Sequence, residues 1–226
     1  MSRVPSKRRL LLYVVGVVLG LLVLAQLLLP GIAADRIRSR VERYGKVASV
    51  SVSAWPAVKL LWGDADSVHV RAAALALPTG RVAPLLHEAQ GIDTLTFRAE
   101  SVRLGGLRLT AVSLQKQGKR LRAQGRASAA DVQAALPPGV SVQLLGSRDG
   151  EVEVRASGGL FGLSASLDAV AQASGGRLVV HPSGLLLGGF ALTLYSDPRV
   201  SVTGVSAVAG GGQPPGYLLS VTALLR

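Results

Sequence analysis

The residues that could support acid–base or metal chemistry are few in this chain and form no recognisable set. The three histidines, His69, His87 and His181, lie far apart and show no H-E-x-x-H spacing. The stretch 64–67 (Asp-Ala-Asp-Ser) begins like a calcium-binding loop, but His69 and Leu75 stand where that loop requires glycine and glutamate. Cysteine is absent from the chain, which excludes thiol catalysis. The sequence therefore predicts no catalytic residues, no metal site and no cofactor.

Ser113 and Lys116 match the S-x-x-K pattern of penicillin-binding proteins. Residues three apart in a strand point to opposite faces, and this stretch has a strand-like pattern, so the match indicates no active site. Patterns for a nucleophile elbow, a P-loop or a dinucleotide site are also absent. A hydrolase would need His69 or His181 to lie beside Asp64 or Ser113. We therefore expect a protein without enzymatic activity.

The most distinctive stretch is Trp55–Gly63, which holds both tryptophans of the chain. Tryptophan suits the membrane interface because its ring is apolar while its N–H can stay hydrated. Apolar residues on such an irregular segment are able to enter the headgroup layer or to border a lipid cavity. The alternative is that they fill the core beneath a loop. The candidate lipid-contacting residues in this segment are Trp55, Val58, Leu60, Leu61 and Trp62.

An uncharged apolar run, Leu10–Leu29, follows a basic N-terminal tail. The basic residues of the tail are Arg3, Lys7, Arg8 and Arg9. About 20 apolar residues in a helix span a hydrocarbon layer of roughly 30 Å, and positive residues stay on the cytoplasmic side. We therefore expect residues 1–30 to form a single-pass anchor in the cytoplasmic membrane, with the N-terminus inside. Its length favours an uncleaved anchor, although 31–33 (Gly-Ile-Ala) resembles the end of a cleaved signal. Under both interpretations, residues 31–226 form one domain outside the cytoplasm.

The net charge is +12, and two groups of arginines stand out after the apolar run. A basic domain outside the cytoplasm does not meet nucleic acid. Its natural counterpart is an anionic lipid surface, where each nearby Lys or Arg contributes about 1 kcal/mol and where the guanidinium fork binds phosphate well. The alternative is a solvated basic surface that keeps the domain soluble. The candidate headgroup-binding residues are Arg36, Arg40, Arg43, Arg120, Arg122 and Arg126.

The spacing of apolar residues predicts one short helix and then mainly strands. Ile37, Val41 and Tyr44 recur with a helical period, which indicates a helix over 34–44 with arginines beside its apolar stripe. From residue 47 the period changes to two, as in half-buried strands. The predicted strands cover 47–53, 68–72, 95–104, 120–127, 140–145, 151–156, 163–170, 178–180, 190–194, 200–205 and 218–225.

Two short helices and a tight turn are predicted between these strands. One helix lies over 84–91, with proline at its start and glycine after its end. The other lies over 128–136 and begins with a Ser–Asp capping pair. A turn at 148–150 (Arg-Asp-Gly) joins two strands. The apolar positions shift phase between Phe97 and Val102, which implies either a bulge or a strand long enough to cross from one environment to another.

The run 50–70, Val-Ser-Val-Ser-Ala-Trp-Pro-Ala-Val-Lys-Leu-Leu-Trp-Gly-Asp-Ala-Asp-Ser-Val-His-Val, resembles the opening of the LmeA-like phospholipid-binding family of actinobacterial cell-envelope proteins. Members of that family begin with a signal or anchor and a short basic helix. A strand follows, then a loop with an aromatic residue, a proline, spaced leucines and a glycine, then a strand of alternating valines. This chain has these parts in the same order, although Ala54-Trp55 stands where the family usually has Gly-Phe. The capped helix over 128–136 also resembles the family's middle.

This resemblance implies an α+β fold in which a long, highly curved antiparallel β-sheet and a few short helices form an apolar groove. It also implies phospholipid binding and a role in the assembly of lipid-linked envelope glycans, with an envelope glycosyltransferase as a candidate partner. The composition agrees, since the chain is 49% hydrophobic but only 4% aromatic, and an aliphatic wall suits an acyl chain. Further candidate lipid contacts lie on strands: Val68, Val70, Leu95 and Phe97.

Three hypotheses follow from these observations. The first is a membrane-anchored protein that holds phospholipid or a polyprenyl-phosphate lipid outside the cytoplasm without catalysis. It depends on an aliphatic hollow between the curved sheet and its covering helices, open toward the bilayer. The second is an envelope scaffold whose sheet docks a partner protein and whose interior is filled by side chains. The third is the lipid-modifying hydrolase that a histidine cluster would require.

Overall fold

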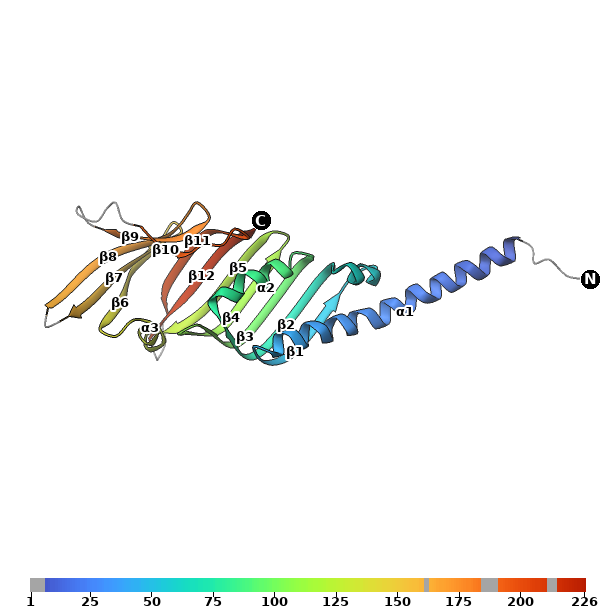
Figure 1. Cartoon of the computed structure of the whole chain (residues 1–226), viewed down its shortest axis with the longest axis horizontal. Helices are drawn as coiled ribbons and strands as arrows, with labels where there is room; N and C mark the ends of the chain where they lie inside the picture. The colour runs from blue at the N-terminus through green and yellow to red at the C-terminus, as the bar shows by residue number, and fades with distance from the viewer. Residues whose placement is uncertain (1–6, 161–162, 184–190, 211–214) are drawn as a thin grey trace, which may run out of the picture.

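The computed structural model describes residues 7–160, 163–183, 191–210 and 215–226. Arg3 of the predicted basic tail and Phe190 at the start of a predicted strand lie outside these residues. The chain is mostly strand, as the sequence predicts. A long N-terminal helix projects from one end of an elongated, β-rich body (Figure 1).

A single helix, α1 (Lys7–Glu42), contains both the apolar run and the predicted short basic helix. Pro30 lies inside it and lacks only the N–H that would reach the carbonyl of Gln26. Leucines and alanines on both sides of the proline favour the helix, so the prediction of a separate helix over 34–44 was wrong. The predicted apolar stripe is confirmed, because Ile37 and Val41 pack against the body.

Part of α1 is suited to a membrane. Among the described residues, the stretch Gly20–Glu42 is long and apolar enough to cross a bilayer by length and composition, a property that a signal sequence shares. The large apolar side chains of this stretch are 46–74% exposed, although the helix already contacts the body from Gln26 on; they are Leu21, Leu22, Val23, Leu24, Leu27, Leu28 and Ile32. A helix with this surface is stable when lipid surrounds it.

The strands form two sheets. Sheet A has seven strands in the order β1-β2-β3-β4-β5-β12-β11. Its strands are β1 (Gly45–Ser53), β2 (Ala65–Leu77), β3 (Ile92–Leu104), β4 (Leu107–Gln117), β5 (Arg120–Ser128), β11 (Val200–Gly210) and β12 (Gly216–Leu225). Sheet B has five strands in the order β10-β9-β8-β7-β6. Its strands are β6 (Val140–Arg148), β7 (Glu151–Leu160), β8 (Leu163–Ser174), β9 (Arg177–Ser183) and β10 (Leu192–Tyr195).

The pairing of β2 with β3 departs from the antiparallel pattern that we expected. These two strands run parallel, whereas the other described ladders of sheet A are antiparallel. A parallel pair needs a crossover connection, and here η2 (Thr79–Arg81) and α2 (Val82–Glu88) supply it. The predicted curved sheet with a few short helices is confirmed, and this parallel pair makes it a mixed sheet.

The register of sheet A lines residues up in rows that cross its strands. One row is apolar and contains Val50, Val70, Phe97, Leu114, Ala123, Val221 and Val205. The next row is polar and contains Ser51, His69, Thr96, Gln115, Arg122 and Thr222. Because successive residues of a strand point to opposite faces, we name the face of the apolar row the inner face and the other the outer face.

The apolar set shifts phase midway along the strands, as the sequence predicts. Ala72 pairs with Ala99, and three residues later Leu75 pairs with Val102; all four are buried. A step of three would turn a side chain to the other face of a regular strand. In β4 the disturbance falls at Ala111, whose φ is 48°, beside a register shift. The predicted change of phase is therefore confirmed, and register shifts accompany it in the ladders of β1 with β2 and of β4 with β5.

The inner face is covered from two ends. Over the first strands, Ile37 of α1 contacts the cluster that includes Val68. At the far end, β11 packs on sheet B through a cluster shared by Val205 and Val152 of β7. From the crossover, α2 adds Leu86 to a third cluster. The middle strands β4, β5 and β12 thus lie between a helical cover and sheet B.

The other local predictions are confirmed as well. The predicted helix over 128–136 is α3 (Ala129–Ala135), and Ser128 Oγ accepts the N–H of Asp131 at 3.0 Å as its cap. The turn between β6 and β7 has positive φ at Asp149 (55°) and Gly150 (84°). Aspartate followed by glycine tolerates this conformation, which matches the twist of a hairpin.

Candidate functional site

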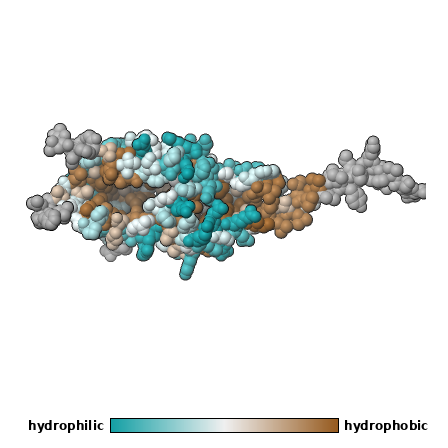
Figure 2. Space-filling model, in the orientation of Figure 1, coloured by the Kyte–Doolittle hydropathy of each residue, from teal (hydrophilic) through white to brown (hydrophobic). Residues whose placement is uncertain are grey.

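The middle of the inner face carries aliphatic side chains that neighbouring elements cover in part, since Leu114 packs on the cluster that Leu86 of α2 joins and Leu219 packs on the cluster shared with sheet B. Leu114, Ala123 and Leu219 are half-buried, and Val221 is 37% exposed. They lie on the neighbouring strands β4, β5 and β12. Figure 2 shows an apolar strip along the middle of the body, hollowed between more hydrophilic margins. Such a surface can hold an alkyl chain, because each CH₂ that it buries contributes about 0.8 kcal/mol.

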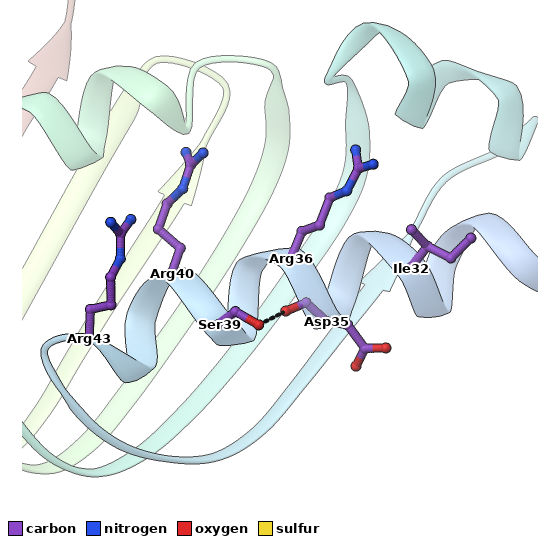
Figure 3. Close-up of a pocket in the computed structure, with 6 residues that line it drawn as sticks. All are labelled: Ile32, Asp35, Arg36, Ser39, Arg40 and Arg43. Atoms are coloured by element: carbon purple, nitrogen blue, oxygen red, sulfur yellow. Dashed lines mark hydrogen bonds between the residues drawn. The ribbon is translucent and has the colours of Figure 1, made fainter.

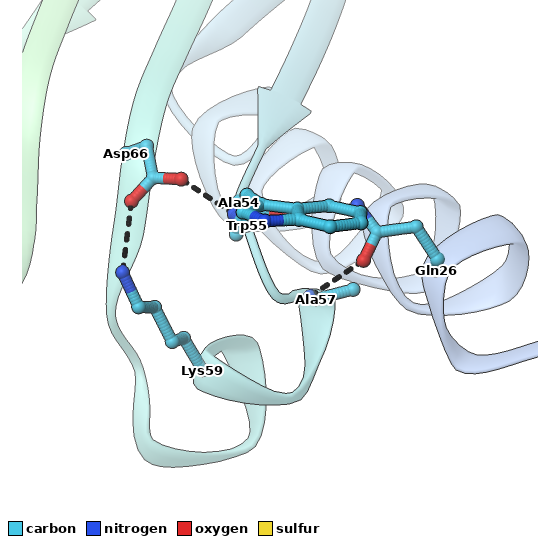
Figure 4. Close-up of polar contacts among 6 residues, drawn as sticks. All are labelled: Gln26, Ala54, Trp55, Ala57, Lys59 and Asp66. Atoms are coloured by element: carbon cyan, nitrogen blue, oxygen red, sulfur yellow. Dashed lines mark hydrogen bonds and ion pairs between the residues drawn. The ribbon is translucent and has the colours of Figure 1, made fainter. Parts of the chain in front are cut away.

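The segment Trp55–Gly63 is fastened to α1. Most of it forms a 3₁₀ helix, η1 (Ala57–Trp62), that lies against α1. Gln26 makes the connection: its Nε2 donates to the carbonyl of Ala54 at 3.1 Å, and its Oε1 accepts the N–H of Ala57 at 2.8 Å (Figure 4). Gln26 lies inside the apolar run of α1, so the segment is held at the level of that run.

The opposite side of this segment is held by Asp66 of β2. Its carboxylate accepts the N–H of Trp55, and it pairs with Lys59 across 3.4 Å (Figure 4). The largest apolar side chains nevertheless point outward, since Trp55 is 72%, Leu61 66% and Trp62 73% exposed. Core filling, the alternative for these three residues, is therefore wrong.

The remaining predicted lipid contacts lie inside the fold. Val68 and Val70 are buried in the cluster that Ile37 of α1 covers. The others are half-buried; they are Val58, Leu60, Leu95 and Phe97. In this arrangement Val68 and Val70 contact protein, and they do not border an open surface. Their burial fixes α1 on the sheet, which is a structural role.

The first predicted arginine group forms a stripe along α1. Arg36, Arg40 and Arg43 project from the same side of the helix (Figure 3). They line an open cavity of about 560 Å³ together with Ile32, Asp35 and Ser39. Arg40 also pairs with Glu88 of α2, with 2.5 Å between Nη1 and Oε2. Within the described residues, Arg36 and Arg43 form no ion pair, so these two arginines of the stripe are available to an anion.

The second predicted group, Arg120, Arg122 and Arg126, does not join the arginine stripe. These residues alternate along β5 with Leu121 and Ala123, which belong to the inner face. They are exposed on the outer face, whereas α1 packs on the inner face. The two groups of candidate headgroup-binding arginines therefore do not form one site, because the sheet lies between them.

Lys116 was not among the residues predicted to form a site. It lies on the inner face of β4, is only 2% exposed, and its Nζ donates to the carbonyl of Ile92. Burial lowers the pKa of Lys116, while the nearby charge of Asp93 acts in the opposite direction. It borders a second, polar cavity of about 210 Å³. Its phase, two residues after the apolar Leu114, was the signal that placed it inside.

The residues with catalytic potential stay apart. His69 lies on the outer face of sheet A, whereas His181 lies in sheet B. Ser113 pairs with Gln124 of the outer face while Lys116 is buried on the inner one, which confirms that these two side chains point to opposite faces of the sheet. Among the described residues, no group of three or more His, Cys, Asp or Glu could hold a metal ion.

Comparison with known proteins agrees with the family resemblance of the run 50–70. The family model described as LmeA-like phospholipid-binding matches residues 23–213, which include the end of α1, the η1 segment, sheet B and most of sheet A. No curated protein and no solved structure matched the chain. The match covers well over half of the sequence, and the chain belongs to the LmeA-like phospholipid-binding family.

Proposed function

We propose that this protein binds phospholipid or another anionic lipid outside the cytoplasm, with α1 as its membrane anchor and without catalysis. The acyl chains would lie on the open aliphatic strip of the inner face, and the phosphate would meet the arginine stripe. The observation that carries this proposal is the half-exposed set Leu114, Ala123, Leu219 and Val221 in a protein of this family.

The position of the arginine stripe supports the assignment of the headgroup. Arg36 lies seven residues beyond Leu29, the last residue of the apolar run. At 1.5 Å per residue this is about 10 Å along the helix, close to the outer edge of a headgroup layer of about 5–7 Å. Arginine binds phosphate with two parallel N–H donors, so the stripe suits the first charged group that a lipid presents on leaving the bilayer.

The η1 segment supports an entry side at the membrane. Gln26 holds this segment beside the apolar run of α1, and Trp55, Leu61 and Trp62 are exposed there. Indole rings are stable at the boundary between headgroups and acyl chains. The corner of sheet A next to η1 would therefore rest in the outer leaflet, with the aliphatic strip extending away from it.

The direct test is to measure the lipid that the full-length protein retains in detergent after extensive washing. We expect wild type to keep phospholipid, detected by native mass spectrometry and by extraction. Val221→Glu places a charge on the aliphatic strip and should lose most of that lipid. The matched change Ser220→Glu, on the outer face of the same strand, should keep it. Wild type without lipid, or equal loss in both variants, would refute the proposal.

A role in lipid-linked envelope glycan assembly, with a glycosyltransferase partner, is a further proposal that rests on the resemblance of the opening motif. The competing function is a scaffold that docks a protein on the sheet. In-cell crosslinking separates the two: crosslinks from the outer face to a glycosyltransferase, together with no retained lipid, favour the scaffold. Retained lipid that turns over when glycan synthesis is running favours the lipid role.

A further inference from the structure

The outer face of sheet A carries a concentrated positive charge that the lipid role leaves unused. Seven exposed arginines lie on four neighbouring strands, β2 to β5. They form what we name the outer-face arginine surface: Arg71, Arg98, Arg103, Arg108, Arg120, Arg122 and Arg126. Glu100 is the exposed carboxylate among them. The surface is separated from the arginine stripe of α1 by the thickness of the sheet.

Two pairs of these arginines are register partners, while the carboxylate of Glu100 lies two residues after Arg98 on the same face. Arg71 is the register partner of Arg98, and Arg103 is that of Arg108. Like charges at paired positions destabilise a sheet. In the described part of the chain, none of the seven arginines lies within 4.0 Å of a carboxylate oxygen. The ion pairs there are formed by other basic residues. The arrangement costs stability without an internal partner, which points to an external anion.

The residues between the arginines narrow the chemistry of that anion. They are small or polar hydrogen-bonding residues, such as Ser67, Thr96, Ser113, Gln115 and Gln124. Apart from His69, no aromatic residue and no large aliphatic residue joins these rows between β2 and β5. A stable protein interface has an apolar core with aromatic anchors, and single-stranded nucleic acid needs aromatic stacking platforms. Neither requirement is met here.

A bilayer is also a poor occupant of this surface. The anchor α1 packs on the inner face, where Ile37 and Val41 contact the sheet. The outer face is thus turned away from the helix that enters the membrane. The surface is fitted instead to an elongated anion outside the bilayer. Strands lie about 4.8 Å apart and alternate residues about 6.6 Å apart, so the guanidinium groups match a chain with one negative charge every ~5–7 Å.

We propose that the outer-face arginine surface binds a linear phosphate-bearing polymer, with the guanidinium forks holding successive phosphates and the serine, threonine and glutamine side chains donating to the oxygens between them. The binding is independent of the lipid on the inner face. It would fix the protein to a polyanion on the side of the sheet opposite the anchor.

The test uses the full-length protein in a zwitterionic detergent with long-chain inorganic polyphosphate as the probe. The triple variant Arg71→Gln/Arg98→Gln/Arg103→Gln should weaken binding at least tenfold. It should also lower the slope of log Kd against log salt by about 2, since each lost phosphate contact contributes about 0.7. The control Arg36→Gln/Arg40→Gln/Arg43→Gln removes the same charge from α1 and should change the affinity less than twofold. Orthophosphate at the same phosphate concentration should not compete.

Three outcomes would overturn the inference. The first is that wild type does not bind polyphosphate, and the second is that both triple variants lose the same polyphosphate affinity. The third is that the outer-face variant still binds polyphosphate but no longer binds anionic phospholipid vesicles. The last outcome would assign the surface to a second membrane. Retained lipid is measured on the same samples, and the outer-face variant should retain as much lipid as wild type. The lipid role and this inference can therefore fail separately.

Discussion

Gln26 of α1 accepts the backbone N–H of Ala57 at 2.8 Å, and this contact joins α1 to the η1 segment, Trp55–Gly63. The other half of the same amide donates to Ala54. A polar side chain inside an apolar helix is costly in lipid unless it is paired. Here both of its hydrogen-bonding groups are satisfied by the body of the protein. Gln26 therefore fixes the position of the η1 segment along the apolar run of α1.

Replacing Gln26 with leucine should loosen this segment and leave the anchor intact. Two hydrogen bonds are lost, each contributing about 0.5–1.5 kcal/mol. We expect amide hydrogen exchange over 54–63 to become roughly tenfold faster, with β3 to β5 unchanged. Gln133→Leu removes a side-chain hydrogen bond near α3 and serves as the control. Unchanged exchange over 54–63 in Gln26→Leu would show that the amide does not hold the segment.

The two tryptophans of the chain report on this segment alone, since both lie in it. With the full chain in phospholipid nanodiscs, we expect blue-shifted emission and strong quenching by phospholipids brominated near the carbonyl end of the acyl chain. The reason is that exposed Trp55 and Trp62 sit beside the apolar part of α1. Emission typical of water, with quenching by aqueous iodide only, would place the segment outside the bilayer.

The arginine stripe should determine the preference for anionic lipid. Each arginine near the surface contributes about 1 kcal/mol, or about fivefold in affinity. Arg36→Gln/Arg43→Gln should therefore lower the ratio of anionic to zwitterionic lipid retained by the protein roughly 20-fold or less. The change Arg148→Gln/Arg177→Gln removes equal charge from sheet B and should leave the ratio unaltered. An equal ratio in wild type and in the α1 variant would exclude the stripe as the headgroup site.

Lys116 should make stability depend on alkaline pH. Burial lowers its pKa below the ordinary value of 10.5, so between the lowered pKa and 10.5 the unfolded chain binds more protons than the folded one. The free energy of unfolding therefore rises with pH through that window and is reduced below it. Lys116→Met should remove this rise, whereas the exposed neighbour in Lys119→Met should preserve it. Parallel curves for wild type and Lys116→Met, measured by denaturant unfolding in detergent, would contradict the assignment.

Local sequence signals predicted much of the fold because each has a short-range cause. The Ser–Asp pair at 128 and 131 makes a hydrogen-bonded cap, and the Asp149-Gly150 turn needs positive φ. The shift from Phe97 to Val102 indicates a change of phase because the period of a strand is two. None of these depends on a distant part of the chain.

The features that the sequence did not reveal depend on long-range packing. The division into two sheets rests on β11 packing on sheet B, and the parallel pairing of β2 with β3 rests on where α2 crosses. The predicted anchor and the predicted helix over 34–44 are one continuous helix that passes through Pro30. The separation of the two arginine groups could have been predicted from the period of two along 120–126. Arg122 stands between the apolar Leu121 and Ala123, so it must point to the opposite face of the sheet.

Photocrosslinking of lipid to the full chain in nanodiscs shows directly whether acyl chains lie on the inner face of sheet A. A phospholipid with a diazirine at the end of one acyl chain is irradiated, and the attachment sites are mapped by mass spectrometry. If lipid binds there, we expect adducts on the aliphatic strip of β4, β5 and β12, in addition to those on α1. The expected attachment sites on the strip are Leu114, Ala123, Leu219 and Val221. Adducts confined to α1 and the η1 segment would contradict lipid binding on the strip.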